Sequence, residues 1–224
     1  MLMQFQKGDI VRHLGLLDLQ RTIQRALRRS GLPIAYSNGF NPHIVMSFAS
    51  ALSSGVPGDA ELLDVSLNGD TTEEACLEAM NRVLPPALKV SRIRLVDDRF
   101  PKVTAAMQQA QYRITLRGEN TEKMVSAIAD FLKEEEIMAL RKTKKAETMV
   151  NIRPMLHELI VLETGKEEAV LRARVSFVEQ ATLKPELLLD SLASYANAQL
   201  PGHEIRRTQL LGLVQGQPTP LIDM

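Results

Sequence analysis

Two hydrophobic periods alternate along this chain, and their order constrains the fold more than any other feature. Segment 16–30 has apolar residues at helical spacing. A second helical segment, 71–84, opens with a capping box from Thr71 to Glu74 and ends before two prolines. Segments 60–67 and 88–96 alternate apolar and polar residues, as half-buried strands do. Residues 1–12 predict a further strand, and 34–48 contain extended pieces. The resulting order, β-α-β-β-α-β, indicates the ferredoxin-like split βαβ arrangement.

A similar order follows in the second half. Strands are expected at 111–118, 169–180 and 204–214, and helices at 119–136 and 184–202. Two extended segments, 137–145 and 147–163, are expected to be joined by a basic bend. The tail, 215–224, has the composition of a loop. We therefore expect an α+β fold of two tandem ferredoxin-like (split βαβ) units with antiparallel sheets. Unit boundaries at 1–98 and 99–224 are predicted, and no residue repeat relates the halves.

Composition narrows the chemistry. Cys76 is the only cysteine, which excludes an internal disulfide, a thiolate zinc site and a cysteine-ligated iron–sulfur cluster. None of the four histidines pairs with another at helical metal-ligand spacing, so we expect no metal and no cofactor. The apolar runs are too short for a membrane span, and the N-terminus lacks a signal-peptide pattern. We therefore expect a cytoplasmic protein without membrane contact.

Charge is unevenly distributed although the net charge is zero. Residues 1–50 hold six basic and two acidic side chains, whereas 51–80 hold seven acidic side chains and no Lys or Arg. A neutral protein with one basic region can still bind phosphate locally.

Most of the basic residues of 1–50 lie in the first helical segment, 16–30. Arg21, Arg25 and Arg28 share one helical face with Asp18, and Arg29 is adjacent. Arginine forks match phosphate oxygens, which favours a phosphate-contacting face. The alternative is a solvated polar face opposite the apolar one, with Asp18 paired to Arg21.

The stretch YSNGFNPHIVMSF, residues 36–48, is the second candidate site. Asn38-Gly39 predicts a turn and Asn41-Pro42 a further bend. An exposed aromatic beside histidine, serine and asparagine side chains suits stacking and hydrogen bonding to an unpaired base, and the candidates are Ser37, Asn38, Phe40, Asn41 and His43. Alternatively, Phe40 fills the core and His43 bonds a backbone carbonyl. Arg153, before a proline, is a further candidate ligand or an internal partner.

The run from Leu17 to Gly55, with its GFNPH and SF motifs, resembles the radical SAM-linked uncharacterised bacterial domain family. The resemblance continues at NIRP (151–154) and KPELLL (184–189). The chain departs from the family pattern at Gly15-Leu16, where Ser-His is usual, and at Ile44-Val45, where Pro and a basic residue are usual. Members occur beside, or fused to, cobalamin-binding radical SAM proteins. The resemblance implies a radical SAM protein as partner, and it supplies no reaction.

The leading hypothesis is an RNA-binding accessory module that presents a structured RNA, tRNA or rRNA, to a radical SAM partner acting in trans. With one cysteine, the chain cannot itself hold a CxxxCxxC-type cluster. We expect no catalytic activity of its own. Two alternatives stay open: a protein–protein adapter without nucleic-acid contact, and a metal-independent ribonuclease-like enzyme with His43 as acid–base.

Overall fold

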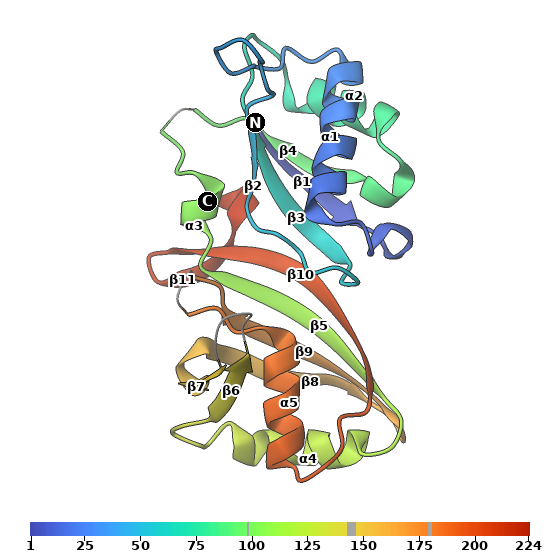
Figure 1. Cartoon of the computed structure of the whole chain (residues 1–224), viewed down its shortest axis with the longest axis vertical. Helices are drawn as coiled ribbons and strands as arrows, with labels where there is room; N and C mark the ends of the chain where they lie inside the picture. Colours follow the sequence, from blue (N-terminus) through green and yellow to red (C-terminus); the bar gives the residue numbers. More distant parts are fainter. Residues whose placement is uncertain (98, 143–146, 179–180) are drawn as a thin grey trace. The chain divides into compact units, whose positions relative to one another are not determined.

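The computed structural model describes residues 1–97, 99–142, 147–178 and 181–224. The chain forms two compact units (Figure 1). Unit 1 comprises Met1–Gln108 and Arg207–Met224, and unit 2 comprises Gln109–Arg206. These units differ from the expected division at residues 98 and 99, because the C-terminal segment returns to unit 1 instead of staying with the second half.

Unit 1 is built on a sheet with the strand order β4-β1-β3-β2, in which all neighbours are antiparallel. Residue 207 of β10 adds one parallel bridge to β3. The elements of its first segment are, in chain order, β1 (Leu2–Lys7), η1 (Asp9–Val11), α1 (Leu16–Ser30), β2 (Met46–Phe48), β3 (Gly58–Val65), α2 (Glu73–Val83), η2 (Pro86–Leu88), β4 (Val90–Arg94) and α3 (Val103–Ala106).

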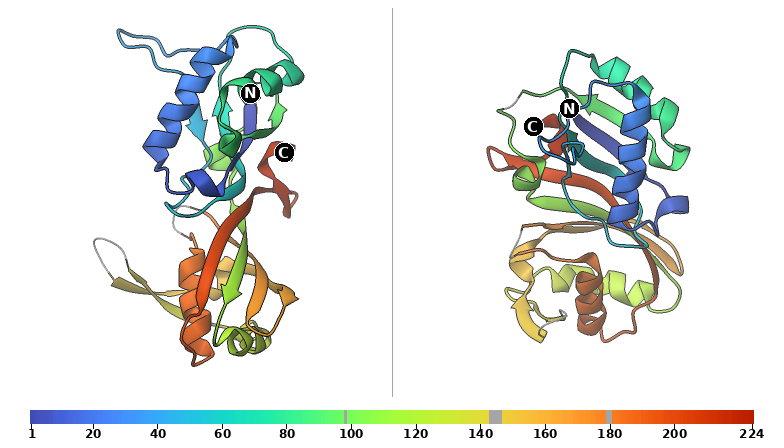
Figure 2. Two further views of the ribbon diagram at one scale, coloured as in Figure 1. Left: turned by 90° about the vertical axis from the view of Figure 1, so that its right-hand side faces the viewer. Right: turned by 45° about the horizontal axis from the view of Figure 1, so that its top comes forward.

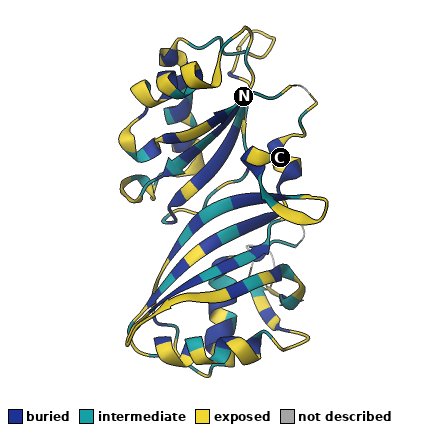
Figure 3. Cartoon of the chain, turned by 180° about the vertical axis from the view of Figure 1, so that it is seen from behind, coloured by how far each residue is buried: buried dark blue, intermediate teal, exposed yellow. Residues whose placement is uncertain are grey.

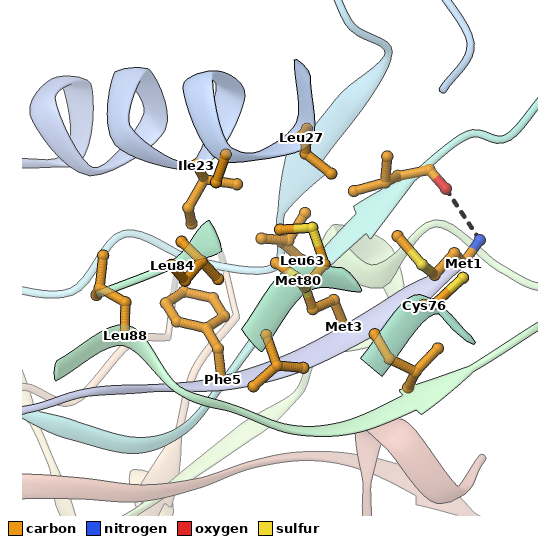
Figure 4. Packing of buried hydrophobic residues seen from close by; sticks show 14 of the residues in the cluster. Met1, Met3, Phe5, Ile23, Leu27, Leu63, Cys76, Met80, Leu84 and Leu88 are labelled. Carbon is orange, nitrogen blue, oxygen red and sulfur yellow. Dashed lines mark hydrogen bonds between the residues drawn. The ribbon is translucent and has the colours of Figure 1, made fainter. Parts of the chain in front are cut away.

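The core of unit 1 lies between this sheet and the helices α1 and α2 (Figure 4). Ile23 and Leu27 of α1, Met80 of α2 and Phe5 of β1 are almost fully buried in one hydrophobic cluster. Phe5 also meets Phe48 of β2 edge to face, with 6.2 Å between the ring centroids. Aliphatic and methionine side chains fill the remaining space, as the low aromatic content requires.

The ends of α1 follow the sequence closely. Gly15 is the N-cap, Asp18 stands in the first turn, and Gly31 ends the helix with φ = 79°. The start of α2 differs from the expected capping box by one residue. Thr72, not Thr71, is the N-cap, and its hydroxyl accepts a hydrogen bond from the Ala75 N–H at 3.2 Å.

This shift makes a testable prediction. Thr72→Ala removes the cap and is expected to lower the free energy of unfolding by about 1 kcal/mol. Thr71→Ala is the matched control and should cost less, because among the described residues the Thr71 hydroxyl bonds only to the Cys76 sulfur, at 3.6 Å. Chemical denaturation of both variants measures the difference. Equal losses would contradict the assignment of the cap.

In unit 2 the strand order is the first part of β10, followed by β5, β9 and β8. The pairs β5–β9 and β9–β8 are antiparallel, while β6 and β7 form a separate two-stranded sheet. Its elements are β5 (Gln109–Arg117), α4 (Thr121–Phe131), β6 (Met138–Lys142), β7 (Glu147–Asn151), η3 (Arg153–Met155), β8 (Leu156–Thr164), β9 (Glu168–Ser176), α5 (Pro185–Tyr195) and β10 (Gly202–Val214).

The C-terminal tail is not the loop that its composition suggests. β11 (Gln217–Pro220) forms a hairpin with β10, and η4 (Leu221–Asp223) follows it. Leu221 and Ile222 are buried in unit 1. The Arg92 guanidinium pairs with the Asp223 carboxylate at 2.7 Å. Two apolar side chains and an ion pair therefore hold the tail in place.

A buried ion pair connects β10 with β3. Arg207 donates from Nε and Nη2 to the two carboxylate oxygens of Glu61, at 2.8 and 2.5 Å, and from Nη1 to the Ser50 hydroxyl at 3.1 Å. Lys7 is also buried, and its ammonium donates to the Arg12 carbonyl at 2.8 Å. Burial lowers the pKa of Lys7, Glu61 opposes this shift, and Arg207 adds to it.

The α+β class and the mostly antiparallel pairing are confirmed. Buried and exposed residues alternate along strands such as β5, as expected for sheets covered on one face (Figure 3). Among the residues described, no helix combines the length and the hydropathy of a membrane span.

Candidate nucleic-acid interface

The segment between α1 and β2 forms a protruding loop. Its two arms are joined by an antiparallel bridge between Tyr36 and Ile44. The Ser37 N–H donates to the His43 carbonyl at 2.8 Å, and the His43 N–H donates to the Ser37 hydroxyl at 3.0 Å. Ile44 is buried and anchors the returning arm. The loop between Ser37 and His43 is therefore closed at its base by defined bonds.

The tip of this loop, the 37–43 loop, lies entirely in solvent. Every residue from 37 to 43 is exposed, and the Phe40 ring is fully so. Gly39 has φ = 129°, a value that side-chain-bearing residues rarely adopt, so the turn before Phe40 depends on glycine. The structure thus excludes the alternative in which Phe40 fills the core.

Three of the four polar candidates of this loop have no side-chain hydrogen bond among the described residues. These three are Asn38, Asn41 and His43. The Ser37 hydroxyl is used within the loop, so Ser37 positions the backbone. Within the described part of the chain, no carboxylate or second base is hydrogen-bonded to the His43 ring. An acid–base role for His43 would therefore lack a second catalytic group.

The four arginines of α1 are all exposed but differ in their engagement. Arg21 pairs with Asp18 at 3.2 Å, as one sequence alternative expects. Arg29 donates to the Val83 carbonyl at the end of α2, at 3.1 Å. Arg25 and Arg28 have no hydrogen-bond or ion-pair partner in the described ranges. They are the two guanidiniums of this helix that are available to an external anion.

The loop follows directly from the end of α1. Gly31 turns the chain out of the helix, and the first arm of the loop begins a few residues later. The left view of Figure 2 shows the loop standing out from the body of unit 1 beyond this end of α1. The last turn of α1, with Arg28 and Arg29, is thus the part of the helix nearest in sequence to the aromatic tip.

Arg153 belongs to unit 2 and is engaged internally. Its Nη1 donates to the Leu156 carbonyl at 3.2 Å and its Nη2 to the Leu132 carbonyl at 3.1 Å, at the C-terminal end of α4. A cation there complements the helix dipole. This geometry fits the internal-partner alternative for Arg153.

Sequence reasoning missed one residue of the loop. Tyr36 lies at the base of the loop and is 47% exposed, so it gives this end of unit 1 a second accessible aromatic ring. The sequence did contain a signal for Tyr36, because it is the first residue of the candidate stretch 36–48. Elsewhere, Cys76 is buried among apolar side chains, as a core residue is. No group of three metal-ligating side chains occurs within the described ranges.

The sequence matches one family model, described as an uncharacterised protein conserved in bacteria (DUF2344), over residues 1–185. No curated protein sequence matches the chain.

Two solved structures have a similar fold. One is a chain in the crystal structure of a Cbf5–Nop10–Gar1 complex, with a TM-score of 0.52 and 15% identity over 93% of this chain. The other is a chain of an H/ACA RNP bound to a substrate RNA containing 2'-deoxyuridine, with a TM-score of 0.50 and 14% identity over the same share. This chain covers 48% and 47% of those chains, about half of their length. Such identities show a likeness of fold alone.

Proposed function

The chain belongs to the bacterial family DUF2344, and we propose that it is an RNA-binding accessory module that holds unpaired bases at the 37–43 loop. The observation that carries the proposal is the fully exposed Phe40 ring among free polar side chains. An aromatic ring left in water gives up the free energy of burial, and a stacking base would recover it.

The chemistry around Phe40 suits RNA. The free amides of Asn38 and Asn41 present donors and acceptors that match base edges. Arg25 and Arg28 supply free guanidiniums for phosphates. One of the two structures of similar fold is an H/ACA RNP bound to a substrate RNA, which supports the proposal only at the level of fold.

Salt dependence tests the arginine part of the interface. We expect binding of the full chain to a single-stranded oligoribonucleotide to weaken as salt rises, with a log–log slope of about 0.7 per phosphate contact. The Arg25→Ala/Arg28→Ala variant should bind more weakly and reduce this slope by about 1.4. Fluorescence anisotropy at several salt concentrations measures both quantities.

The matched control removes the same charge elsewhere. Lys89 and Lys166 are exposed and have no partner among the described residues. Lys89→Ala/Lys166→Ala should leave the slope near that of the unchanged protein. If both double variants lower the slope equally, binding depends on overall charge, and α1 is not the phosphate-contacting element.

The partner is the second part of the proposal. The resemblance to the radical SAM-linked family suggests a radical SAM protein that acts in trans on tRNA or rRNA held by this chain. Cys76 is the only cysteine and is buried, so a cluster would have to come from that partner. A pull-down with the purified partner, with and without RNA, tests this. Absence of a complex in both conditions would contradict it.

We also propose that both units have the split βαβ topology. In unit 1 the strand order is β4-β1-β3-β2, and in unit 2 it is β10-β5-β9-β8. Numbered within each unit, both orders are 4-1-3-2, with a helix after the first and third strands. The β6–β7 hairpin is then an insertion between α4 and the second strand of unit 2.

A further inference from the structure

Strand β6 has a free edge. The Ile152 N–H donates to the Ile137 carbonyl at 2.8 Å on the side facing β7. Because bonding directions alternate along an antiparallel strand, the N–H and C=O groups of Met138, Leu140 and Lys142 point away from β7. These backbone groups have no partner in the described part of the chain. Such an edge is a template for another strand.

A groove follows this edge. Figure 1 shows β6 between β7 and α5. Two hollows of about 570 and 390 Å³ adjoin along β6, and both are lined by Leu140 of β6 and by Leu187 and Asp190 of α5. Each volume falls in the range of ordinary ligand sites, about 300–1,000 Å³. The open strand edge therefore faces a helix across a channel.

The larger hollow combines exposed apolar side chains with an acidic rim. Met138, Leu140 and Tyr195 are 52%, 42% and 42% exposed, which leaves substantial apolar surface in water. Its charged lining residues are all acidic, namely Glu134, Glu136 and Asp190. The smaller hollow adds three basic residues, Arg141, Lys142 and Lys184, and the acidic Glu186. The groove therefore has an acidic end and a mixed, more basic end.

We propose that this groove binds an extended segment of a partner protein, which adds to β6 as a third strand of the hairpin. Main-chain bonds to the free edge would supply affinity, and alternate apolar side chains would cover Leu140 and Leu187. β6 allows a segment of about five residues at about 3.4 Å each. The acidic rim selects a segment with Lys or Arg at the end beside Glu134 and Glu136.

A second copy of the chain does not fit this site. The groove runs between β6 and α5, and the free β6 edge of a second copy could reach it only together with the β7 and α5 of that copy. The occupant must be an isolated extended segment. The proposal concerns unit 2 and does not depend on RNA binding at the 37–43 loop of unit 1.

The test uses the full chain and a fluorescent peptide of sequence Arg-Lys-Leu-Thr-Val-Thr-Leu. We expect saturable binding in fluorescence polarisation. The same peptide with N-methyl groups at alternate residues should bind at least about tenfold more weakly, because it cannot donate to the edge. A peptide with Glu-Glu in place of Arg-Lys should also bind more weakly.

The matched protein variant is Glu136→Gln/Asp190→Asn, which changes two exposed groups without a described partner. It should lower affinity by up to about fivefold for each charge and leave the thermal midpoint unchanged. No saturable binding, or equal binding of the N-methylated peptide, would overturn the proposal. Self-association of the chain that the peptide displaces would instead identify a second copy as the occupant and also overturn it.

Discussion

Replacing Arg207 with alanine is expected to lower the free energy of unfolding by about 3–5 kcal/mol. The Arg207 and Glu61 side chains are only 1% and 5% exposed, so the variant leaves a carboxylate buried without its bidentate partner. The loss should appear in the unfolding of unit 1, because this pair holds the returning strand against β3. Chemical denaturation followed by circular dichroism measures it.

Two variants separate charge pairing from packing. Glu61→Leu/Arg207→Met removes both charges at similar volume and should recover most of the loss. Lys7→Met removes a buried cation. Because burial already lowers the pKa of Lys7, this variant should lower the free energy of unfolding by less than Arg207→Ala does. If Arg207→Ala changes the unfolding free energy by less than 1 kcal/mol, the buried pair is not what secures the C-terminal segment.

Replacing Phe40 with alanine is expected to weaken binding of single-stranded RNA by about 5- to 150-fold. This factor corresponds to about 1–3 kcal/mol for the loss of one stacked base. Stability should not change, because the ring is fully exposed and contributes no burial. The measurement is a fluorescence anisotropy titration with a labelled oligoribonucleotide, beside a thermal melt of each protein.

Two controls make the Phe40 result specific. Phe40→Tyr keeps an aromatic face and should bind nearly as well as the unchanged protein. Val45→Ala shortens another exposed apolar side chain, which follows the loop, and should have little effect. An affinity of the Phe40→Ala variant equal to that of the unchanged protein would show that the ring does not stack on a base.

The ends of α1 were predictable because local rules determine them. Gly15 before an apolar period and Gly31 after it are signals that act within a few residues. The positions of β3 and β4 were predictable from the apolar–polar alternation in their sequences, although most residues of β3 are buried in the structure. The predicted N-cap of α2 was wrong by only one residue, since Thr71 and Thr72 offer the same hydroxyl chemistry.

Long-range features could not be predicted in this way. Glu61 and Arg207 lie 146 positions apart, and neither alternation nor spacing indicates that they meet. The burial of Leu221 and Ile222 in unit 1 could not be predicted either, because a short tail becomes ordered only through contacts with residues distant in the sequence. The division at residues 98 and 99 missed this return for that reason.

The candidate site was only partly predictable. The turn residues of the 37–43 loop were evident, but a Gly-Phe-Asn-Pro turn can direct its aromatic ring inward or outward. The bridge between Tyr36 and Ile44 settles the register of the arms and leaves Phe40 in solvent. For Arg153, the deciding partners are carbonyls of residues that only the fold brings near.

The most direct test of base stacking on residue 40 uses the absence of tryptophan from this chain. Phe40→Trp places a single tryptophan fluorophore at the tip of the 37–43 loop. We expect single-stranded RNA to quench this emission, and the quenching to saturate together with binding measured by anisotropy, because a base stacks on the ring. Unchanged emission while the RNA binds would show that the RNA contacts another surface, and would contradict the account.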